Sequence, residues 1–258
     1  MKIGLLIKPV PDTETRIKIA GDSLGIDESD IKFVPNPYDE YAYEEALKLN
    51  EAIGEGEVVA ITVAGEEGKN VLKKAALAVG CHRAIHVMVD KNQKPDAFQT
   101  ASLIAKIIEE EKFDIVFSGK QAIDLDQSLV PFHVAELMKW PIVPAITSFK
   151  LADDKSSVIV ERVTDEGKEV IESKIPVLLT TTKGLNDPRY AKLKGIMAAK
   201  KKPMAEKIAS ELGIPEAATK IVKVSSPPSR KAPKIIDGEF PENVNTLVEL
   251  LHNEAKII

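Results

Sequence analysis

Cysteine is almost absent from this sequence of 258 residues, since Cys81 is the only one. A single cysteine excludes an internal disulfide framework, a zinc site made of cysteines and a CxxC redox pair. Long apolar runs are missing as well: the stretch MKIGLLIKPVPD is too short for a signal peptide, and no later stretch reaches membrane-spanning length. We therefore expect no membrane insertion, and a location in the cytoplasm of a prokaryote or the mitochondrial matrix of a eukaryote.

An excess of positive charge is also missing, because 35 Lys and Arg stand against 40 Asp and Glu, for a formal net charge of -5. This balance argues against broad nucleic-acid binding. Catalytic patterns are scarce: no GxSxG elbow occurs, no GxGxxG follows a strand-like run, and the histidines lack metal-ligand spacing. The histidines are His82, His86, His133 and His252. We expect a binding scaffold without catalytic residues or a metal site, and not an enzyme.

Apolar runs separated by helical patterns fill the first two thirds of the chain. The hydrophobic content of 44% supplies a sizeable core. Apolar residues at helical spacing occur between the runs, for example Ala42, Ala46 and Leu49. The strand-like runs are Lys2–Lys8, Glu57–Val63, Arg83–Val89 and Asp114–Ser118. Strands separated by helices of this length predict crossover units and an α/β fold with a Rossmann-like, doubly wound, mostly parallel sheet.

The last third of the chain has a different pattern. Two runs, Ser157–Val163 and Lys168–Ile171, flank Thr164–Gly167 and predict a small antiparallel hairpin region. The run Ile175–Thr181 could return to the main sheet as a buried strand. A final helix is expected over about Asn243–Lys256.

From Gly184 onwards the chain is basic and rich in loop signals, and Pro227, Pro228 and Pro233 forbid a long helix there. A tail without its own core usually packs on something else, either the parent domain or a partner. We divide the chain into an α/β domain over residues 1–183, a segment over 184–203 and a C-terminal arm over 204–258.

Three strand-to-helix connections carry residues suited to a ligand, which in open parallel sheets binds beyond the carboxyl ends of the strands. Asn36-Pro37-Tyr38-Asp39 precedes the first long helix, where Asn36 could also act as a helix cap and nothing more. Val63 ends the second run before an Ala-Gly pair, which lets a ligand approach the backbone closely. Gly119–Asp126 (GKQAIDLD) offers N–H groups that could hold a phosphate, or it is only a polar loop. These residues alone leave both interpretations open.

The stretch from Gly184 to Pro203, GLNDPRYAKLKGIMAAKKKP, is hard to bury. It combines Arg189, Tyr190, an isolated Leu193 and three successive lysines, Lys200–Lys202. One exposed apolar residue among polar neighbours is what a transient docking site needs, and the lysines would attract an acidic partner. The other interpretation places Leu193 in the core and leaves the lysines merely solvated. The residues alone favour this second interpretation.

Five stretches of the sequence match, in order, the motifs of one family. They are Ile7–Thr13 (IKPVPDT), Asn36–Leu49 (NPYDEYAYEEALKL), Gly80–Val87 (GCHRAIHV), Gly119–Asp126 (GKQAIDLD) and Leu185–Pro203 (LNDPRYAKLKGIMAAKKKP). Together they resemble the β subunit of electron-transfer flavoprotein. The last two are long and chemically unusual, and the match ends before the tail.

The resemblance implies an electron-carrier heterodimer of fatty acid oxidation, in which an α subunit holds most of the FAD and this chain buries a structural AMP. Electrons would come from acyl-CoA dehydrogenases and pass on to electron-transfer flavoprotein:quinone oxidoreductase. The arm over 204–258 is expected to pack on the α subunit. The implied AMP contacts are Leu6, Asn36, Pro37, Tyr38, Asp39, Val63, Gly119, Lys120, Gln121, Ala122, Ile123, Asp124, Leu125, Asp126, Gln127, Ser128, Leu129 and Val130.

The resemblance also implies a recognition loop within the segment 184–203. Its implied docking contacts are Arg189, Tyr190, Leu193, Ile196, Met197, Lys200, Lys201 and Lys202. Among them Leu193 aligns with the leucine that plugs into a hydrophobic pocket of acyl-CoA dehydrogenases.

One departure from the family concerns Leu129-Val130-Pro131, which stand where the family usually has Gln-Thr/Val-Gly. Pro131 has no backbone N–H to donate to a phosphate. Bifurcating members of the family, the alternative, carry a second FAD in place of AMP and oxidise NADH. Their recognition region usually departs from the LNxPRY pattern kept here, so we favour the AMP-containing type. A stand-alone adenine-nucleotide sensor is a third possibility, which the long, proline-broken tail disfavours.

Overall fold

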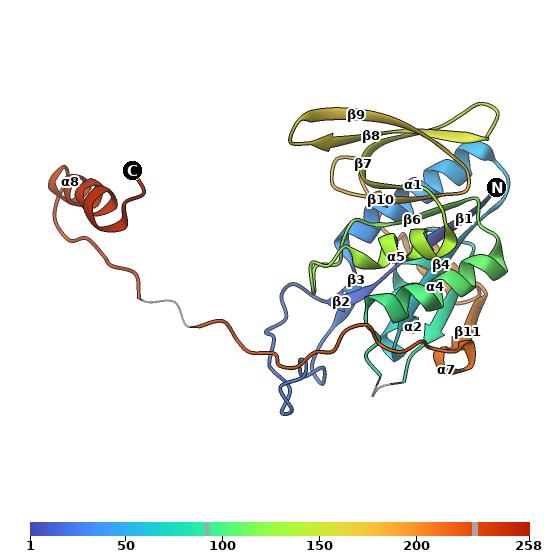
Figure 1. Ribbon diagram of the computed structural model, residues 1–258, viewed down its shortest axis with the longest axis horizontal. Coiled ribbons are helices and arrows are strands. Elements are labelled where there is room, and N and C mark those ends of the chain that lie inside the picture. The colour runs from blue at the N-terminus through green and yellow to red at the C-terminus, as the bar shows by residue number, and fades with distance from the viewer. Residues whose placement is uncertain (91–92, 229–231) are drawn as a thin grey trace.

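A nine-stranded sheet runs through the computed structural model, which describes residues 1–90, 93–228 and 232–258 (Figure 1). Neighbouring strands are parallel from β11 as far as β7, and antiparallel beyond it. In spatial order the strands are β11 (Met204–Ile208), β5 (Arg83–Met88), β4 (Glu57–Ala64), β1 (Lys2–Leu6), β6 (Ile115–Gly119), β10 (Val177–Thr181), β7 (Ile142–Leu151), β8 (Ser157–Thr164) and β9 (Gly167–Lys174). The predicted α/β class with a mostly parallel sheet is confirmed.

Helices cover both faces of this sheet and bury two separate apolar layers. On one face α1 (Pro37–Ile53), α2 (Glu66–Lys74) and α3 (Ala76–Val79) pack on side chains such as Leu5 and Phe117. On the other, α4 (Ala97–Glu111), α5 (Leu129–Met138) and α7 (Ala209–Leu212) pack on side chains such as Leu6 and Val116. Side chains alternate between faces along a strand, so central strands that are apolar at every position serve both layers.

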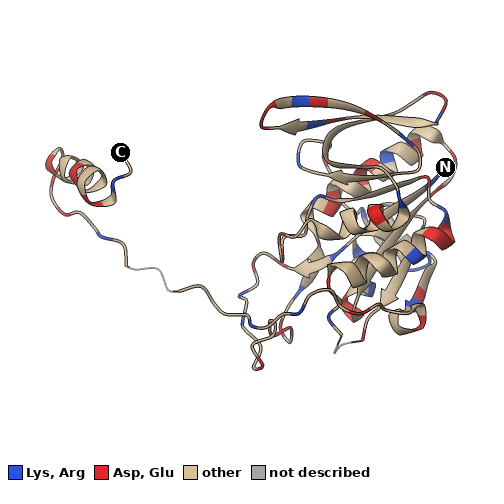
Figure 2. Ribbon diagram, viewed as in Figure 1, with Lys and Arg blue, Asp and Glu red and all other residues tan. Residues whose placement is uncertain are grey.

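The antiparallel part of the sheet contains the predicted hairpin and one strand that the sequence did not reveal. β8 and β9 pair from Ser157↔Lys174 to Thr164↔Gly167, which confirms the hairpin. Arg162 bonds Glu169 and Lys168 bonds Glu161, and charges of both signs lie along this hairpin in Figure 2. The missed strand is β7.

Two features explain why β7 was missed. The strand contains Pro144, and Ala145 has a positive φ of 54°, so its pairing shifts register near this point. A proline and a bulge break the apolar run that marks a strand in the sequence. By contrast, β10 lies between β6 and β7, so the predicted return of this stretch to the main sheet is confirmed.

The stretch after residue 184 is more regular than the loop-rich pattern predicted. Residues Leu193–Ala199 form the helix α6, and Met204–Ile208 form β11, which pairs in parallel with β5 at the sheet edge. The sequence pattern indicated neither of these two elements. Only one side of an edge strand is paired, and β11 keeps exposed residues along its length, so its sequence lacks the apolar run of a central strand. The arm over 204–258 thus begins within the sheet.

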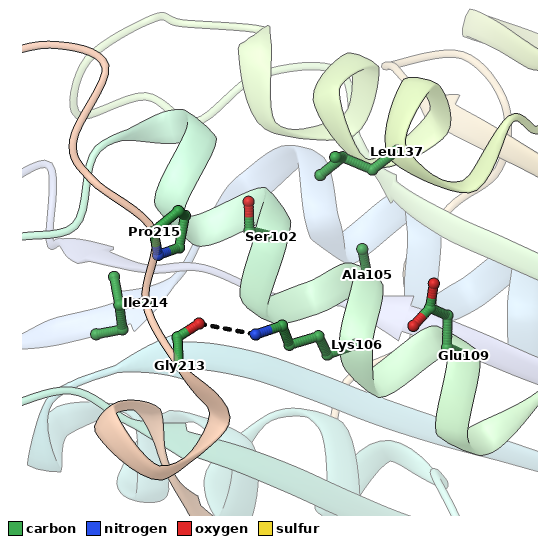
Figure 3. Close-up of a pocket in the computed structure, with 8 residues that line it drawn as sticks. All are labelled: Ser102, Ala105, Lys106, Glu109, Leu137, Gly213, Ile214 and Pro215. Carbon is green, nitrogen blue, oxygen red and sulfur yellow. Dashed lines mark hydrogen bonds between the residues drawn. The ribbon is translucent and has the colours of Figure 1, made fainter.

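Residues 212–219, here called the strap, cross the outer side of α4. Lys106 donates to the carbonyl of Gly213 at 2.8 Å and also bonds that of Leu212 (Figure 3). Gln99 donates to Pro215 O at 2.8 Å, and Thr219 N donates to Asp96 at 2.7 Å. An open pocket of about 530 Å³ lies between the strap and helices α4 and α5.

The chain ends in α8 (Glu242–Glu249) followed by a π-helical stretch, η1 (Leu250–Ala255), which confirms the predicted final helix. None of the α8 side chains is buried, and Figure 1 shows this helix apart from the sheet. No helix in the described part of the chain combines the length and apolar character that a membrane crossing needs. A smaller antiparallel pair, β2 (Pro9–Pro11) with β3 (Phe33–Pro35), lies between β1 and α1 in the chain.

Candidate functional site

The carboxyl ends of β1, β4 and β6 meet at one edge of the sheet, where Asn36 leads into α1. Pro37 occupies the first helical turn as expected, but Asn36 makes no capping bond with its side chain. Its amide instead donates to the carbonyl of Gln121 at 2.9 Å and accepts from Ile123 N at 3.2 Å. Asn36 is buried, so these bonds are shielded from water. Asn36 thus occupies the N-cap position of α1, but its side chain does not cap the helix and instead ties the loop after β6 to the start of α1.

Asp39 is a buried carboxylate that joins three parts of this edge. One oxygen accepts from Lys8 N at 2.8 Å, and the other accepts from Asn36 Nδ2 at 2.8 Å and Gly119 N at 3.0 Å. The residue is only 5% exposed. Burial raises the pKa of Asp39 to about 7, although its three donors act in the opposite direction. Asp39 thus holds the ends of β1 and β6 against the first turn of α1.

Gly119 allows these chains to approach one another. A Cβ atom at this position would lie 2.4 Å from Asp39 Oδ1 and 2.8 Å from the backbone carbon of Tyr38. Thr181 completes the junction, because its hydroxyl lies 3.0 Å from Tyr38 O and 3.1 Å from Ser118 O. These contacts leave no space for a side chain at position 119.

The rim of this edge carries charges of both signs. Lys8 Nζ lies 2.6 Å from a carboxylate oxygen of Asp124, and Lys120 Nζ lies 5.0 Å from the ring centre of Tyr38. Gln121 Nε2 donates to Asp126 at 2.8 Å, and Asp126 has a positive φ of 51°. Two lysines therefore border the edge.

Beyond this rim the chain enters α5 at Leu129. Ser128 is the residue before the helix, and its side chain makes no capping bond. The N–H groups of the first turn of a helix have no intrahelical partner and attract anions, and Pro131 removes one of them here. Leu125 and Leu129 are exposed beside this turn.

The hydrogen bonds bring together residues 36–39 and 119–123 of the predicted nucleotide contacts, while Leu6 and Val63 end the adjacent strands β1 and β4. Sequence reasoning missed Lys8 and Thr181. Lys8 follows a buried strand and Thr181 ends another, and a polar residue at that position is the signal that could have found them. The predicted contacts that are half-buried or exposed are Pro37, Tyr38, Val63, Lys120, Gln121, Ala122, Ile123, Asp124, Leu125, Asp126, Gln127, Ser128, Leu129 and Val130.

Residues 184–203 are here called the docking segment. Its first part is bound to α1 and is therefore not a free loop. Arg189 binds the carboxylates of Glu44 and Glu51 with its guanidinium group. Asn186 donates to Tyr41 O at 3.0 Å and to Glu45 at 2.9 Å. Arg189, predicted as a docking contact, is therefore occupied within the chain.

The end of the docking segment is also held internally. Lys202 Nζ donates to Leu77 O at 2.9 Å and to Cys81 O at 2.7 Å, and burial lowers the pKa of Lys202. A Cβ at Gly195 would lie 2.2 Å from the carbonyl oxygen of Ala78, so α6 sits directly on α3. Lys202 is thus bound at the end of α3, whereas Lys200 and Lys201 are exposed.

Between these anchors the docking segment presents a bare apolar face. Tyr190 is 92% exposed, Leu193 75%, Met197 64% and Ile196 44%. Leu193 and Met197 are four residues apart on α6, so they share one face of this helix, and Tyr190 is exposed in the irregular stretch just before it. The interpretation that buries Leu193 in the core is therefore wrong. An apolar cluster of this kind on a surface marks an interaction site.

Comparisons with known proteins show which family the sequence matches. Residues 23–212 match the family model described as the electron transfer flavoprotein domain. Over the full length of both chains the sequence is 36% identical to electron transfer flavoprotein subunit beta of Bacillus subtilis and 35% identical to that of Bradyrhizobium diazoefficiens. It is 33% identical, again over both full lengths, to the mitochondrial subunit beta of Arabidopsis thaliana.

The family match covers the sheet apart from β1, and it includes residues 36–39, residues 119–130 and the docking segment. It defines a class of electron-transfer proteins. The chain belongs to the electron transfer flavoprotein family, among its beta subunits.

Proposed function

We propose that this chain is the β subunit of a heterodimeric electron carrier that binds AMP, scaffolds the FAD of its α subunit and docks acyl-CoA dehydrogenases. Electrons would pass from the dehydrogenase to the flavin and on to electron-transfer flavoprotein:quinone oxidoreductase. The observation that carries the proposal is the bare apolar face of Tyr190, Leu193 and Met197 in the stretch that resembles the family's docking motif. A core-packing role would have buried that face.

The nucleotide part of the proposal rests on the edge formed by residues 36–39 and 119–130. Its backbone segments are fixed by the buried side chains of Asn36 and Asp39, so the edge is organised without a ligand. Lys8 and Lys120 border it, and the loop after β6 leads from it into the N-terminus of α5. Lysines and free N–H groups suit a phosphate, and the small-residue turn at Gly119 suits close approach of an adenosine group.

In this proposal Asn36 and Asp39 support the nucleotide site without contacting the ligand through their side chains. Their polar atoms are largely taken up by the chain itself, so they shape the loop whose backbone and rim side chains face the nucleotide. In this proposal the α-bound FAD would provide the redox chemistry. Its part is to bind, to orient and to dock.

The end of the arm is the surface proposed for the α subunit, because β11 and the strap pack on this chain's own sheet and on α4. Its helix α8 has no buried side chain, and the exposed apolar residues of this helix are Val244, Leu247 and Val248. Apolar side chains of a helix are normally covered by a partner element. The location proposed for the complex is the cytoplasm of a prokaryote or the mitochondrial matrix of a eukaryote. The Arabidopsis relative is named as a mitochondrial protein.

Co-expression with the α subunit, followed by release and identification of the bound nucleotides, tests this function. The proposal predicts one FAD and one AMP for each heterodimer. Two FAD molecules and no AMP would instead establish the bifurcating alternative, which couples to NADH. A chain that does not associate with the α subunit and still binds adenine nucleotide would overturn the carrier function in favour of a sensor.

A further inference from the structure

The docking segment has little reason of its own to be ordered. Its helix α6 has seven residues, begins after Lys192 without a side-chain cap and contains Gly195. Only Ala199 in this helix is buried. A single short helix of this kind is not stable in water. The shape of the segment must therefore come from the contacts that flank it.

Arg189 makes the densest of those contacts. Its Nε and Nη2 atoms lie 2.7 Å and 3.0 Å from the two carboxylate oxygens of Glu44. Its Nη1 and Nη2 atoms lie 2.5 Å and 3.1 Å from the two oxygens of Glu51. One guanidinium group thus binds two carboxylates, and both belong to α1. Paired hydrogen bonds to two carboxylates fix the position and the orientation of the guanidinium group.

Glu44 binds the backbone of Arg189 as well as its side chain. Its Oε2 atom accepts from Arg189 N at 3.0 Å, which fixes the chain directly before Tyr190. The Glu44 side chain is 8% exposed, whereas that of Glu51 is 58% exposed. The loss of a partner for a largely buried carboxylate is costly, so the buried half of this contact is the stronger constraint.

Along the docking segment, residues that contact α1 or α3 alternate with exposed apolar residues. Arg189 is turned in towards α1, and the next residue, Tyr190, is 92% exposed. Gly195 rests on Ala78 of α3, while Met197 is 64% exposed. The anchors therefore determine which side chains face outwards.

We infer that Arg189 is a positioning residue: with Glu44 and Glu51 it holds the docking segment in its docking shape before the partner arrives. This inference rests on the proposed docking function. A segment that is already ordered does not lose conformational freedom on binding, and that loss otherwise weakens association. Arg189 acts through the exposed face of Tyr190, Leu193 and Met197 and does not need to touch the dehydrogenase.

The test compares Arg189→Lys with Arg83→Lys in the heterodimer formed with the α subunit. Arg83 is a matched control because it also binds two carboxylates, Glu57 and Glu111, but lies at the opposite end of its strand from the nucleotide edge. A lysine cannot reproduce the paired bonds of an arginine to two carboxylates. We expect Arg189→Lys to raise the KM of an acyl-CoA dehydrogenase for the heterodimer about tenfold, with kcat unchanged. The reason is that the docking segment must then become ordered as the partner binds, which weakens association. Arg83→Lys should lower the melting temperature without changing KM.

Hydrogen exchange supplies a second readout that needs no dehydrogenase. Backbone amides over residues 190–199 should exchange faster in Arg189→Lys than in the wild type or in Arg83→Lys. If Arg189→Lys fails to assemble, Glu51→Gln weakens only the exposed half of the contact and should give a smaller change in the same direction. Unchanged exchange in this segment, or an equal rise of KM in Arg83→Lys, overturns the positioning role.

The variant Leu193→Ala separates this inference from the docking function on which it rests. If Leu193→Ala raises KM and Arg189→Lys does not, docking stands and the positioning role is wrong. If neither variant changes KM, the docking function itself is wrong.

Discussion

The backbone N–H of Gly119 donates a hydrogen bond of 3.0 Å to the buried carboxylate of Asp39. This bond joins the end of β6 to the first turn of α1, although the two residues are 80 positions apart. A methyl group at position 119 would lie 2.4 Å from the accepting oxygen. The junction between β6 and α1 therefore depends on the absence of a side chain at position 119 and on a carboxylate at position 39.

Substitution of Gly119 by alanine should open this junction. The added methyl must displace Asp39 or the backbone at Tyr38, and overpacking of this kind costs about 1–3 kcal/mol. We expect a lower melting temperature and less nucleotide retained on purification. Gly21→Ala is the control, because a Cβ there has no atom within 4 Å. Equal stability of the two variants would show that the edge tolerates a side chain.

The titration of Asp39 should make stability depend on pH. Burial raises its pKa from 3.8 to about 7 in the folded chain, so the folded state binds this proton more tightly than the unfolded state. The stabilising contribution is fully present below 3.8 and is lost as the pH rises through about 7.

Chemical denaturation over this pH range, in the wild type and in Asp39→Asn, measures the effect. The free energy of unfolding of the wild type should fall relative to that of the variant as the pH rises from 3.8 to about 7. At higher pH the difference between the two should be constant. The amide that Asp39→Asn introduces does not titrate, although its single oxygen satisfies fewer donors. A difference that does not change with pH would mean that Asp39 ionises normally.

Asn36→Ala and Asp124→Ala should both lower the AMP content, but for different reasons. Asn36 binds Gln121 O and Ile123 N from a buried position, so its removal leaves unsatisfied groups, at about 1–3 kcal/mol, even without ligand. Asp124 is exposed on the rim and pairs with Lys8, so its removal should act mainly through the ligand. Melting temperatures of the heterodimer with and without added AMP distinguish the two, since a ligand that binds only the folded state stabilises it. Unchanged AMP content in both variants would place the nucleotide elsewhere.

Much of the fold follows from patterns that lie within one element. The runs that form β1, β4, β5 and β6 are apolar on both faces, and the turn between β8 and β9 has a Gly at its end. Hydrophobic pattern and turn residues were therefore sufficient to predict these strands. The elements that were missed lack such local signals. β7 is broken by Pro144, α6 contains Gly195 among lysines, and β11 keeps the exposed residues of an edge strand.

The site was predictable as a set of segments but not as a set of contacts. The sequence indicated that residues 36–39 and 119–126 meet, because both follow strands at one edge of the sheet. It could not indicate that Asn36 binds Gln121 across 85 positions, or that Arg189 binds Glu44 across 145. Such long-range pairs form only in the packed structure. For this reason the sequence did not show that Asn36 and Arg189, which were assigned to a ligand and to a partner, bind other parts of the same chain.

The docking function is tested most directly by Leu193→Ala in the heterodimer, with Leu24→Ala as a control at another exposed leucine. Melting temperature, FAD spectrum and reduction by an acyl-CoA dehydrogenase are measured on the same preparation. An apolar anchor of a partner pocket contributes about 2 kcal/mol or more, so Leu193→Ala should weaken docking well over tenfold. The account predicts a sharply slower reduction with unchanged melting temperature and spectrum, and no effect of Leu24→Ala. A Leu193→Ala heterodimer that melts lower yet accepts electrons at the normal rate would contradict it.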